Sequence, residues 1–261
     1  MTFLQTFLLA LPVIMTLMTA VWIASVFLKN ASIVDPFWGL GFVLAAIFYF
    51  FSIDEITTRS VIVMTLVTIW GLRLSIYLFL RNAGKGEDFR YQNFRKSYGE
   101  HRYWWVSFFQ VFLLQGILLW LISAPLLGAI YFSDNELNAF DYTAILIWFI
   151  GFAFEAGGDY QLAKFKSNPA NKGKVLDTGF WKFTRHPNYF GDSAVWWGYG
   201  LFSIAAGCNL ATLGSVLMTA LIIKVSGVAL LEKSLKETKP QYQDYIRRTS
   251  SFLPWFPKKS V

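Results

Sequence analysis

Cysteine and histidine are scarce in this chain of 261 residues, which has one cysteine and two histidines. Cys208 has no second cysteine with which to form an internal disulfide, and a Cys/His zinc site needs more ligands than His101 and His186 supply. The sequence also contains no Gly-x-Ser-x-Gly stretch, which argues against an α/β-hydrolase nucleophile. We therefore expect no disulfide, no metal site and no hydrolase triad.

Charged residues are also few, at 15% of the sequence, whereas apolar residues make up 55% of it and the mean hydropathy is +0.45. Such a composition is too apolar for an ordinary soluble domain, and runs of about 20 apolar residues cross roughly 30 Å of hydrocarbon as helices. We expect an all-α, polytopic integral membrane bundle that forms a single domain over residues 1–261. Its seven predicted spans are 3–28, 36–52, 60–80, 107–132, 142–163, 189–206 and 210–231.

The basic residues predict the orientation of these helices. Nineteen of the 23 Lys and Arg residues fall in 81–105, in 164–188 and after 232, whereas the loop 133–141 has none. Because basic segments are retained in the cytoplasm, we expect the amino end outside and the carboxyl end inside, in a bacterial inner membrane. Only a short stretch, 207–209, separates the last two predicted spans, so six spans and a re-entrant hairpin fit the pattern as well.

The net charge of +7 is explained mainly by this topology and by attraction to anionic lipid. No DNA- or RNA-binding motif is visible, which argues against nucleic acid as a partner. Gly39 and Gly41 begin an incomplete dinucleotide fingerprint in which Leu44 occupies the third glycine position, and we interpret them as helix-packing glycines. The sequence leaves open whether the protein binds an anionic cofactor from the cytoplasm.

A dense polar stretch, residues 184–192, precedes the apolar run of the sixth predicted span. Pro187 suits the first turn of a helix, where its missing N–H is not needed. The free N–H groups of that turn, the positive end of the helix dipole and Arg185 together would form an anion site. Asn188 and Asp192 are four residues apart and share one helix face. The alternative, that the stretch only starts a helix, explains fewer of these polar groups than an anion site does.

Charged residues also occur inside two other predicted spans. Arg73 in the third span should face a protein interior or extend its guanidinium to the membrane surface, because an unpaired arginine in hydrocarbon is costly. Glu155 and Asp159 in the fifth span are four residues apart and share a face. Gly157 and Gly158 between them allow close approach of a backbone or a ligand. The alternative is that both carboxylates pair with the lysines that follow them.

Residues beyond the last predicted span form a further pattern. Glu232 follows the apolar run, and Tyr242, Tyr245 and Arg248 then recur at three-residue steps, which places them on one face of a short helix. This helix would either close over a nucleotide or lie on the lipid headgroups.

Several of these stretches resemble a known family. They are Asp159-Tyr160, Gly179-Phe180-Trp181, Arg185 to Asp192, Leu230 to Lys233 and Tyr242 to Ile246. Together they are similar to the carboxyl-terminal half of the steroid 5-alpha-reductase family. The stretches 33–39 and 86–91 resemble its bacterial branch of membrane proteins, and the resemblance covers about residues 30–256.

The resemblance implies an NADPH-dependent reductase that takes the cofactor from the cytoplasm and a lipid or steroid-like enone from the bilayer. The double bond conjugated to the carbonyl accepts a hydride at its β-carbon while an acid polarises the carbonyl oxygen. By position in the motifs, NADPH would be held by Asp159, Arg185, His186, Asn188, Tyr189, Asp192, Glu232, Tyr242, Tyr245 and Arg248.

The polarising groups of that family match less closely. The family uses a Gln-Glu pair on the second span and a Tyr on the third. Here the Glu position falls nearest Asp35, the Gln position at Val34 and the Tyr position near Trp70. Asp35, Trp70 and Arg73 are our candidate catalytic residues, and Asp35 would have to be kept protonated by its apolar neighbours. Alternatively, Asp35 simply caps the second span.

A second enzyme class shares part of the pattern. Isoprenylcysteine carboxyl methyltransferase and phospholipid methyltransferases have a similar Arg-His-Pro-x-Tyr motif and a downstream Glu, which in them serve S-adenosylmethionine. The amino-terminal stretches and the pair Asn188 and Asp192 favour the reductase. A third class, a transporter or scaffold, would use Arg73 and Lys224 to line a pathway.

Overall fold

The computed structural model describes residues 1–132, 136–226 and 242–258. All regular secondary structure in these ranges is helical, with short 3-10 and π segments and no strand. This confirms the predicted all-α class. Contacts divide the chain into two compact units. The first contains Met1–Leu137 and Phe202–Gly214, and the second contains Asn138–Leu201 and Ser215–Val261.

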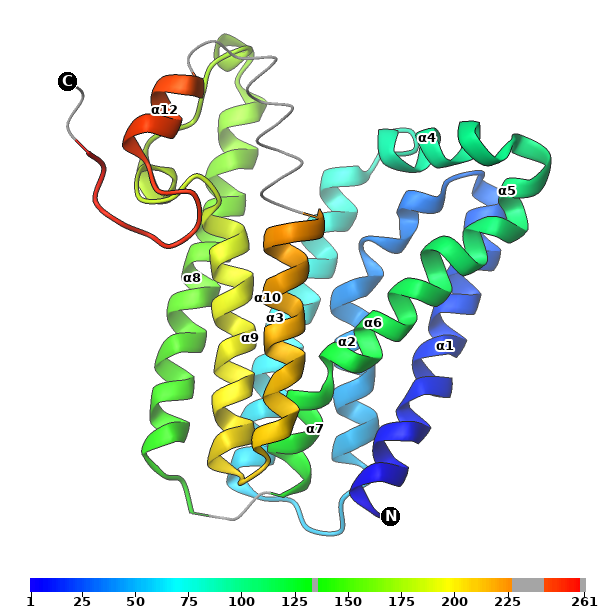
Figure 1. The fold of residues 1–261 in the computed structure, drawn as a ribbon, viewed down its shortest axis with the longest axis vertical. Helices are drawn as coiled ribbons and strands as arrows, with labels where there is room; N and C mark the ends of the chain where they lie inside the picture. The colour runs from blue at the N-terminus through cyan, green and yellow to red at the C-terminus, as the bar shows by residue number, and fades with distance from the viewer. Residues whose placement is uncertain (133–135, 227–241, 259–261) are drawn as a thin grey trace. The chain divides into compact units, whose positions relative to one another are not determined.

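The first unit begins with three helices: α1 (Phe3–Leu28), α2 (Phe37–Phe50) and α3 (Thr58–Asn82). Helix α2 packs against both α1 and α3 (Figure 1). It approaches α3 closely at Gly39, where an added Cβ would lie 2.2 Å from the carbonyl oxygen of Gly71. The interpretation of Gly39 as a helix-packing glycine is confirmed.

The basic segment after α3 contains helices that its charge pattern did not predict. Helix α4 (Phe89–Tyr98) begins after Asp88, whose carboxylate accepts from the backbone N–H of Arg90. It ends at Gly99, whose φ of 83° is accessible to glycine without strain. The chain then continues as α5 (Glu100–Ser107), a π segment (Phe108–Leu113), α6 (Leu114–Ile122) and α7 (Ala124–Tyr131).

The second unit is built on α8 (Ala139–Ser167) and the greater part of α9 (Pro187–Ala205). A Cβ at Gly191 would lie 2.3 Å from the backbone nitrogen of Glu155, so the two helices meet there with no room for a side chain. The unit also includes most of α10 (Leu213–Leu221), the π segment Ile222–Ser226 and the short helix α12 (Tyr242–Arg248).

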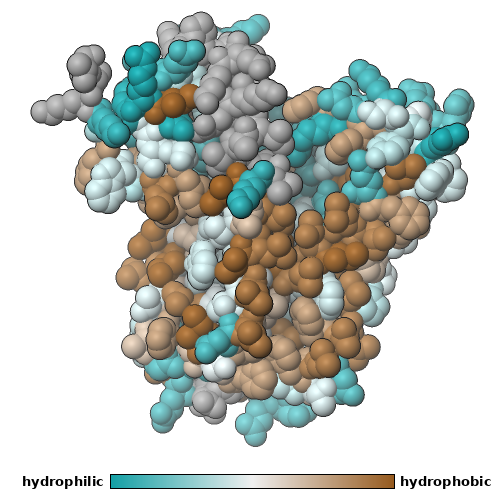
Figure 2. Space-filling model, in the orientation of Figure 1, coloured by the Kyte–Doolittle hydropathy of each residue, from teal (hydrophilic) through white to brown (hydrophobic). Residues whose placement is uncertain are grey.

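Among the residues that the structure describes, five helical segments are long and apolar enough to cross a membrane: Phe3–Leu28, Ala31–Phe50, Thr58–Asn82, Glu100–Tyr131 and Ala139–Ser167. Each coincides with one of the first five predicted spans. Figure 2 shows hydrophobic residues over the middle of α1 and α6 and hydrophilic residues over α4 and α5. Large apolar side chains such as Phe27 and Phe79 are exposed, as expected of a surface that faces lipid. The chain is therefore an integral membrane protein.

The last two predicted spans correspond to helices that differ from these five. Helix α9 has 19 residues, but its first turns contain Asn188 and Asp192, which lower its hydropathy. The segment Asn209–Lys224 is apolar but shorter. The predicted end of the seventh span, after residue 226, lies outside the described residues.

Candidate functional site

The polar stretch before α9 is packed inside the second unit. Helix α9 begins at Pro187, as the sequence predicts. Thr184, Arg185 and His186 are all buried, with at most 7% of their surface exposed. The Thr184 hydroxyl donates to the carbonyl of Phe252 at 2.9 Å and accepts from the His186 N–H at 3.3 Å. The polar residues of the motif therefore join the start of α9 to the segment after α12.

A carboxylate on α8 meets an amide in the first turn of α9. The Asn188 side chain donates to Asp159 at 3.1 Å, and Asp159 is buried. The two helices come together here because Gly158 leaves room: an added Cβ would lie 3.2 Å from the backbone nitrogen of Asn188. Gly157 likewise makes room for the Phe180 ring. The space predicted beside these glycines is filled by the protein itself.

Glu155 is buried one turn before Asp159 on α8, at the crossing with α9. Both predicted carboxylates thus face into the unit, and Asp159 pairs with an amide. Tyr189 and Asp192 continue the polar face of α9 and are partly exposed. The Tyr189 ring stacks on His186, with the ring centroids 5.7 Å apart.

Arg185 binds the carboxyl-terminal end of α12. Its guanidinium donates to the carbonyl of Ile246 at 3.2 Å and to that of Thr249, and its backbone N–H donates to the carbonyl of Ser250 at 2.9 Å. A cation at this end of a helix is favourable because the last carbonyls are unpaired and carry the negative end of the dipole. Arg185 therefore holds α12 against the start of α9.

The predicted face of α12 is the face that packs. Tyr242 and Tyr245 are buried, and the Tyr245 hydroxyl donates to the carbonyl of Trp181. Burial, with the neighbouring Tyr242 and Asp177 acting in the same direction, raises the pKa of the Tyr245 phenol, so that it keeps its proton as a donor. Arg248 forms an ion pair with Asp177. Glu232, the remaining predicted cofactor residue, lies outside the described residues.

Asp35 lies in the first unit, where it meets residues of α4. The hydroxyl of Tyr91 donates to its carboxylate at 2.9 Å, and Arg90 forms an ion pair with it at 3.4 Å. Asp35 does not cap α2: the residue at the cap is Pro36, and the helix start has no side-chain capping hydrogen bond. The carboxylate thus has polar partners in addition to the apolar neighbours expected from the sequence.

A directed hydrogen-bond chain extends from Asp35 into the unit. The Trp38 indole N–H donates to Gln115 at 2.5 Å, the Gln115 amide donates to the Tyr91 hydroxyl at 3.3 Å, and Tyr91 donates to Asp35. Burial and the charge of Asp35 raise the pKa of the Tyr91 phenol, so it is a proton donor throughout the physiological range. An acid, a phenol and an amide therefore come together in one cluster, which we call the Asp35 network.

The other two predicted catalytic residues have different surroundings. Trp70 is fully buried and packs against Phe42 with ring centroids 5.8 Å apart. The Arg73 guanidinium lies 5.5 Å from the centre of the Tyr77 ring. Neither of these two contacts involves Asp35. Sequence reasoning missed Gln115, although an amide in an apolar run is a signal of interior function in a membrane protein.

A second ion pair fixes the loop after α3 to the end of α1. Arg95 donates to both carboxylate oxygens of Glu87, at 2.9 and 3.0 Å, and to the carbonyl of Lys29 at 3.2 Å. Glu87 also accepts from the backbone N–H of Ala31 at 2.7 Å. Within residues 1–132, 136–226 and 242–258, no group of three or more His, Cys, Asp or Glu residues is arranged to hold a metal.

Comparison with known proteins places the chain in a family. Residues 21–249 match the family described as protein of unknown function (DUF1295), so the chain belongs to this family, a membrane family related to the steroid 5-alpha-reductases. A protein of Schizosaccharomyces pombe, described as uncharacterized protein C594.04c, is 26% identical over 259 residues. The match covers 89% of this chain and 75% of the yeast protein. No solved structure matches the chain significantly.

Proposed function

We propose, from membership of a membrane family related to the steroid 5-alpha-reductases, that the protein is an NADPH-dependent reductase. Its substrate would be a lipid or steroid-like molecule with a double bond conjugated to a carbonyl. The observation that carries the proposal is the meeting of Asp159 with Asn188, at the start of a helix that Arg185 joins to α12. Motif residues from three separate stretches of the sequence thus form one cluster in the second unit.

The donor set of that cluster fits a dinucleotide. The ribose hydroxyls and the nicotinamide amide of the cofactor need hydrogen-bond donors and acceptors, which Asp159 and Asn188 supply. A half-buried ring such as that of Tyr189 can stack on a base. Arg185 and Arg248 are the cations near the cluster that suit phosphates. The bound NADPH would supply the hydride that reduces the double bond.

The Asp35 network would act on the substrate carbonyl. Tyr91 keeps its proton and so can donate a hydrogen bond to an oxygen on which negative charge develops. Without substrate the single phenolic proton of Tyr91 goes to Asp35, and it would turn to the carbonyl oxygen when substrate binds, while Gln115 keeps donating to the phenol oxygen. This assigns the polarising role to Tyr91 and makes Asp35 the residue that positions it.

Binding measurements distinguish the reductase from the methyltransferase alternative. We expect the purified protein to bind NADPH in the micromolar range or tighter, and Asn188→Ala to weaken binding about tenfold because a buried carboxylate loses its amide partner. Asn209→Ala, which removes an exposed amide at the opposite end of α9, is the matched control and should bind as the wild type does. Calorimetric titration of the protein with NADPH and with S-adenosylmethionine measures both affinities. Tight S-adenosylmethionine binding without NADPH binding would refute the reductase proposal.

We also propose the seven-span topology with the amino end outside, the carboxyl end in the cytoplasm and the cofactor cluster facing the cytoplasm. The three basic segments support it. In a bacterial host, a reporter that fluoresces only in the cytoplasm should be bright when fused after Val261 and dark when fused after Leu137. The reverse pattern in well-expressed fusions would overturn the orientation and the cytoplasmic entry of the cofactor.

A further inference from the structure

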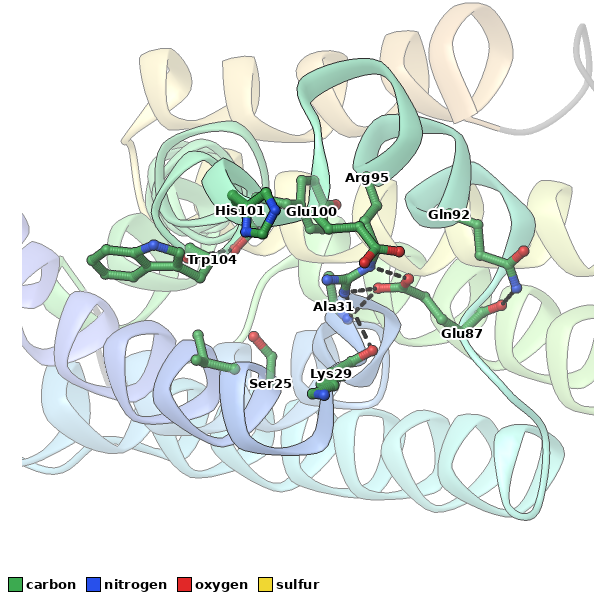
Figure 3. A pocket seen from close by; sticks show the side chains of 12 residues that line it. Ser25, Lys29, Ala31, Glu87, Gln92, Arg95, Glu100, His101 and Trp104 are labelled. Carbon is green, nitrogen blue, oxygen red and sulfur yellow. Dashed lines mark hydrogen bonds and ion pairs between the residues drawn. The ribbon is translucent and has the colours of Figure 1, made fainter.

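A cavity of about 630 Å³ lies in the first unit between the end of α1 and the helices α4 and α5. Figure 3 shows Ser25 of α1 and Lys29, the residue that follows α1, on one side of it and His101 and Trp104 of α5 on the other. The volume is in the range of small-molecule sites and far larger than one water needs. The lining of the cavity shares no residue with the cluster of nucleotide-binding candidates or with the Asp35 network, so neither assignment explains it.

Charges of both signs line the cavity. Lys29 and His101 are exposed basic residues at its edge, and Glu100 beside them is an exposed acid. Arg95 and Glu87 also line it, but they already bind each other (Figure 3). A ligand that carries both a negative and a positive group matches this lining, whereas a purely anionic one would meet Glu100.

Tyr103, a residue that lines the cavity, has a buried hydroxyl with no hydrogen-bond partner among the described residues. Tyr103 is 1% exposed, and its hydroxyl makes no hydrogen bond within the described part of the chain. Its ring lies against the Arg95 guanidinium, 4.6 Å from the ring centre, which fixes the orientation of the side chain. Buried polar groups are nearly always bonded, so an unbonded hydroxyl beside a cavity indicates a ligand that completes it.

The cavity lies where tryptophans mark a membrane surface. Trp104 lines it with 53% of its surface exposed, and the Trp22 indole donates to the Trp104 carbonyl at 2.8 Å. Tryptophans at the ends of membrane helices lie at the level of the lipid headgroups. The face of an exposed indole also attracts ammonium groups.

We propose that this cavity binds the headgroup of a zwitterionic phospholipid. Lys29 and His101 would hold its phosphate, Trp104 and Glu100 its ammonium group, and Tyr103 would donate to a phosphate oxygen. The proposal does not depend on the reductase chemistry, because it uses none of the residues assigned to that chemistry.

Native mass spectrometry of the full chain, released from detergent with lipids of identical acyl chains, tests the proposal. We expect the wild type to retain phosphatidylcholine about tenfold more than phosphatidylglycerol, which lacks the ammonium group. Tyr103→Phe should lower phosphatidylcholine retention about fivefold, the effect of one lost hydrogen bond to a charged group. Tyr98→Phe removes a hydroxyl from an exposed ring outside the cavity and should change nothing.

A second variant tests whether misfolding causes any loss of phosphatidylcholine retention. Lys29→Gln alters an exposed side chain at the edge of the cavity, so the fold should survive while phosphatidylcholine retention falls. Arg102→Gln, an exposed residue of α5 outside the cavity, is its control. Equal retention of both lipids, or unchanged retention in Tyr103→Phe and Lys29→Gln, would overturn the proposal. Water-soluble glycerophosphocholine that binds as tightly as the lipid would overturn the assignment to a membrane lipid.

Discussion

Arg185→Ala is expected to weaken NADPH binding about 10- to 100-fold and to lower the temperature at which the protein unfolds. The guanidinium is a candidate phosphate ligand, and loss of one charge-assisted contact accounts for a change of that size. It also donates to the carbonyls of Ile246 and Thr249, so its removal leaves the end of α12 without its cation. Equilibrium titration and thermal denaturation of the same sample measure both effects.

Two companion variants separate these roles of Arg185. Tyr245→Phe removes another contact that holds α12, the hydroxyl that donates to Trp181, without removing a positive charge. If Arg185 acts only by holding α12, both variants should lose NADPH affinity in proportion to their loss of thermal stability. If it contacts the phosphates, Arg185→Ala should lose much more affinity than Tyr245→Phe. Arg247→Ala, an exposed neighbour on α12, serves as the neutral control.

The spans were predictable because long apolar runs must become helices in hydrocarbon. Predicted and observed boundaries agree within a few residues for Phe3–Leu28 and for α9, which begins at Pro187. The segment 81–105 was harder, because its many basic residues indicated only the side of the membrane. Its helix α4 depends on a cap at Asp88 and a stop at Gly99, which are short local signals.

The residues of the candidate site could be predicted from the sequence, but the contacts between them could not. The motif before α9 marked Arg185 as functional, but only the fold brings the guanidinium to carbonyls 61 and 64 positions further along the chain. The Asp35 network joins Asp35 to Tyr91 across 56 positions, and Tyr91 to Gln115 across 24. No spacing rule links such residues, because their proximity follows from how the helices of the first unit pack.

Asp35→Asn is expected to retain NADPH affinity within about twofold while losing about 100-fold or more of the turnover of an enone lipid. The carboxylate accepts the Tyr91 proton at 2.9 Å, and an amide in its place can turn its NH₂ group toward the phenol and misdirect it. Because this loss falls on stabilisation of the transition state, it lowers kcat rather than cofactor binding. A reductase assay with single-turnover kinetics measures it.

Tyr91→Phe tests which group polarises the carbonyl. If the phenol is the donor, Tyr91→Phe should lose at least as much turnover as Asp35→Asn, and the double variant should lose little more, because residues that act as one unit are not additive. Phe94→Leu, a change in an apolar neighbour of the Tyr91 ring, is the packing control and should stay near wild-type activity. Full activity in Asp35→Asn with loss in Tyr91→Phe would make Tyr91 act alone. Full activity in both would remove the Asp35 network from the chemistry and leave it the structural task of holding α4 against α2.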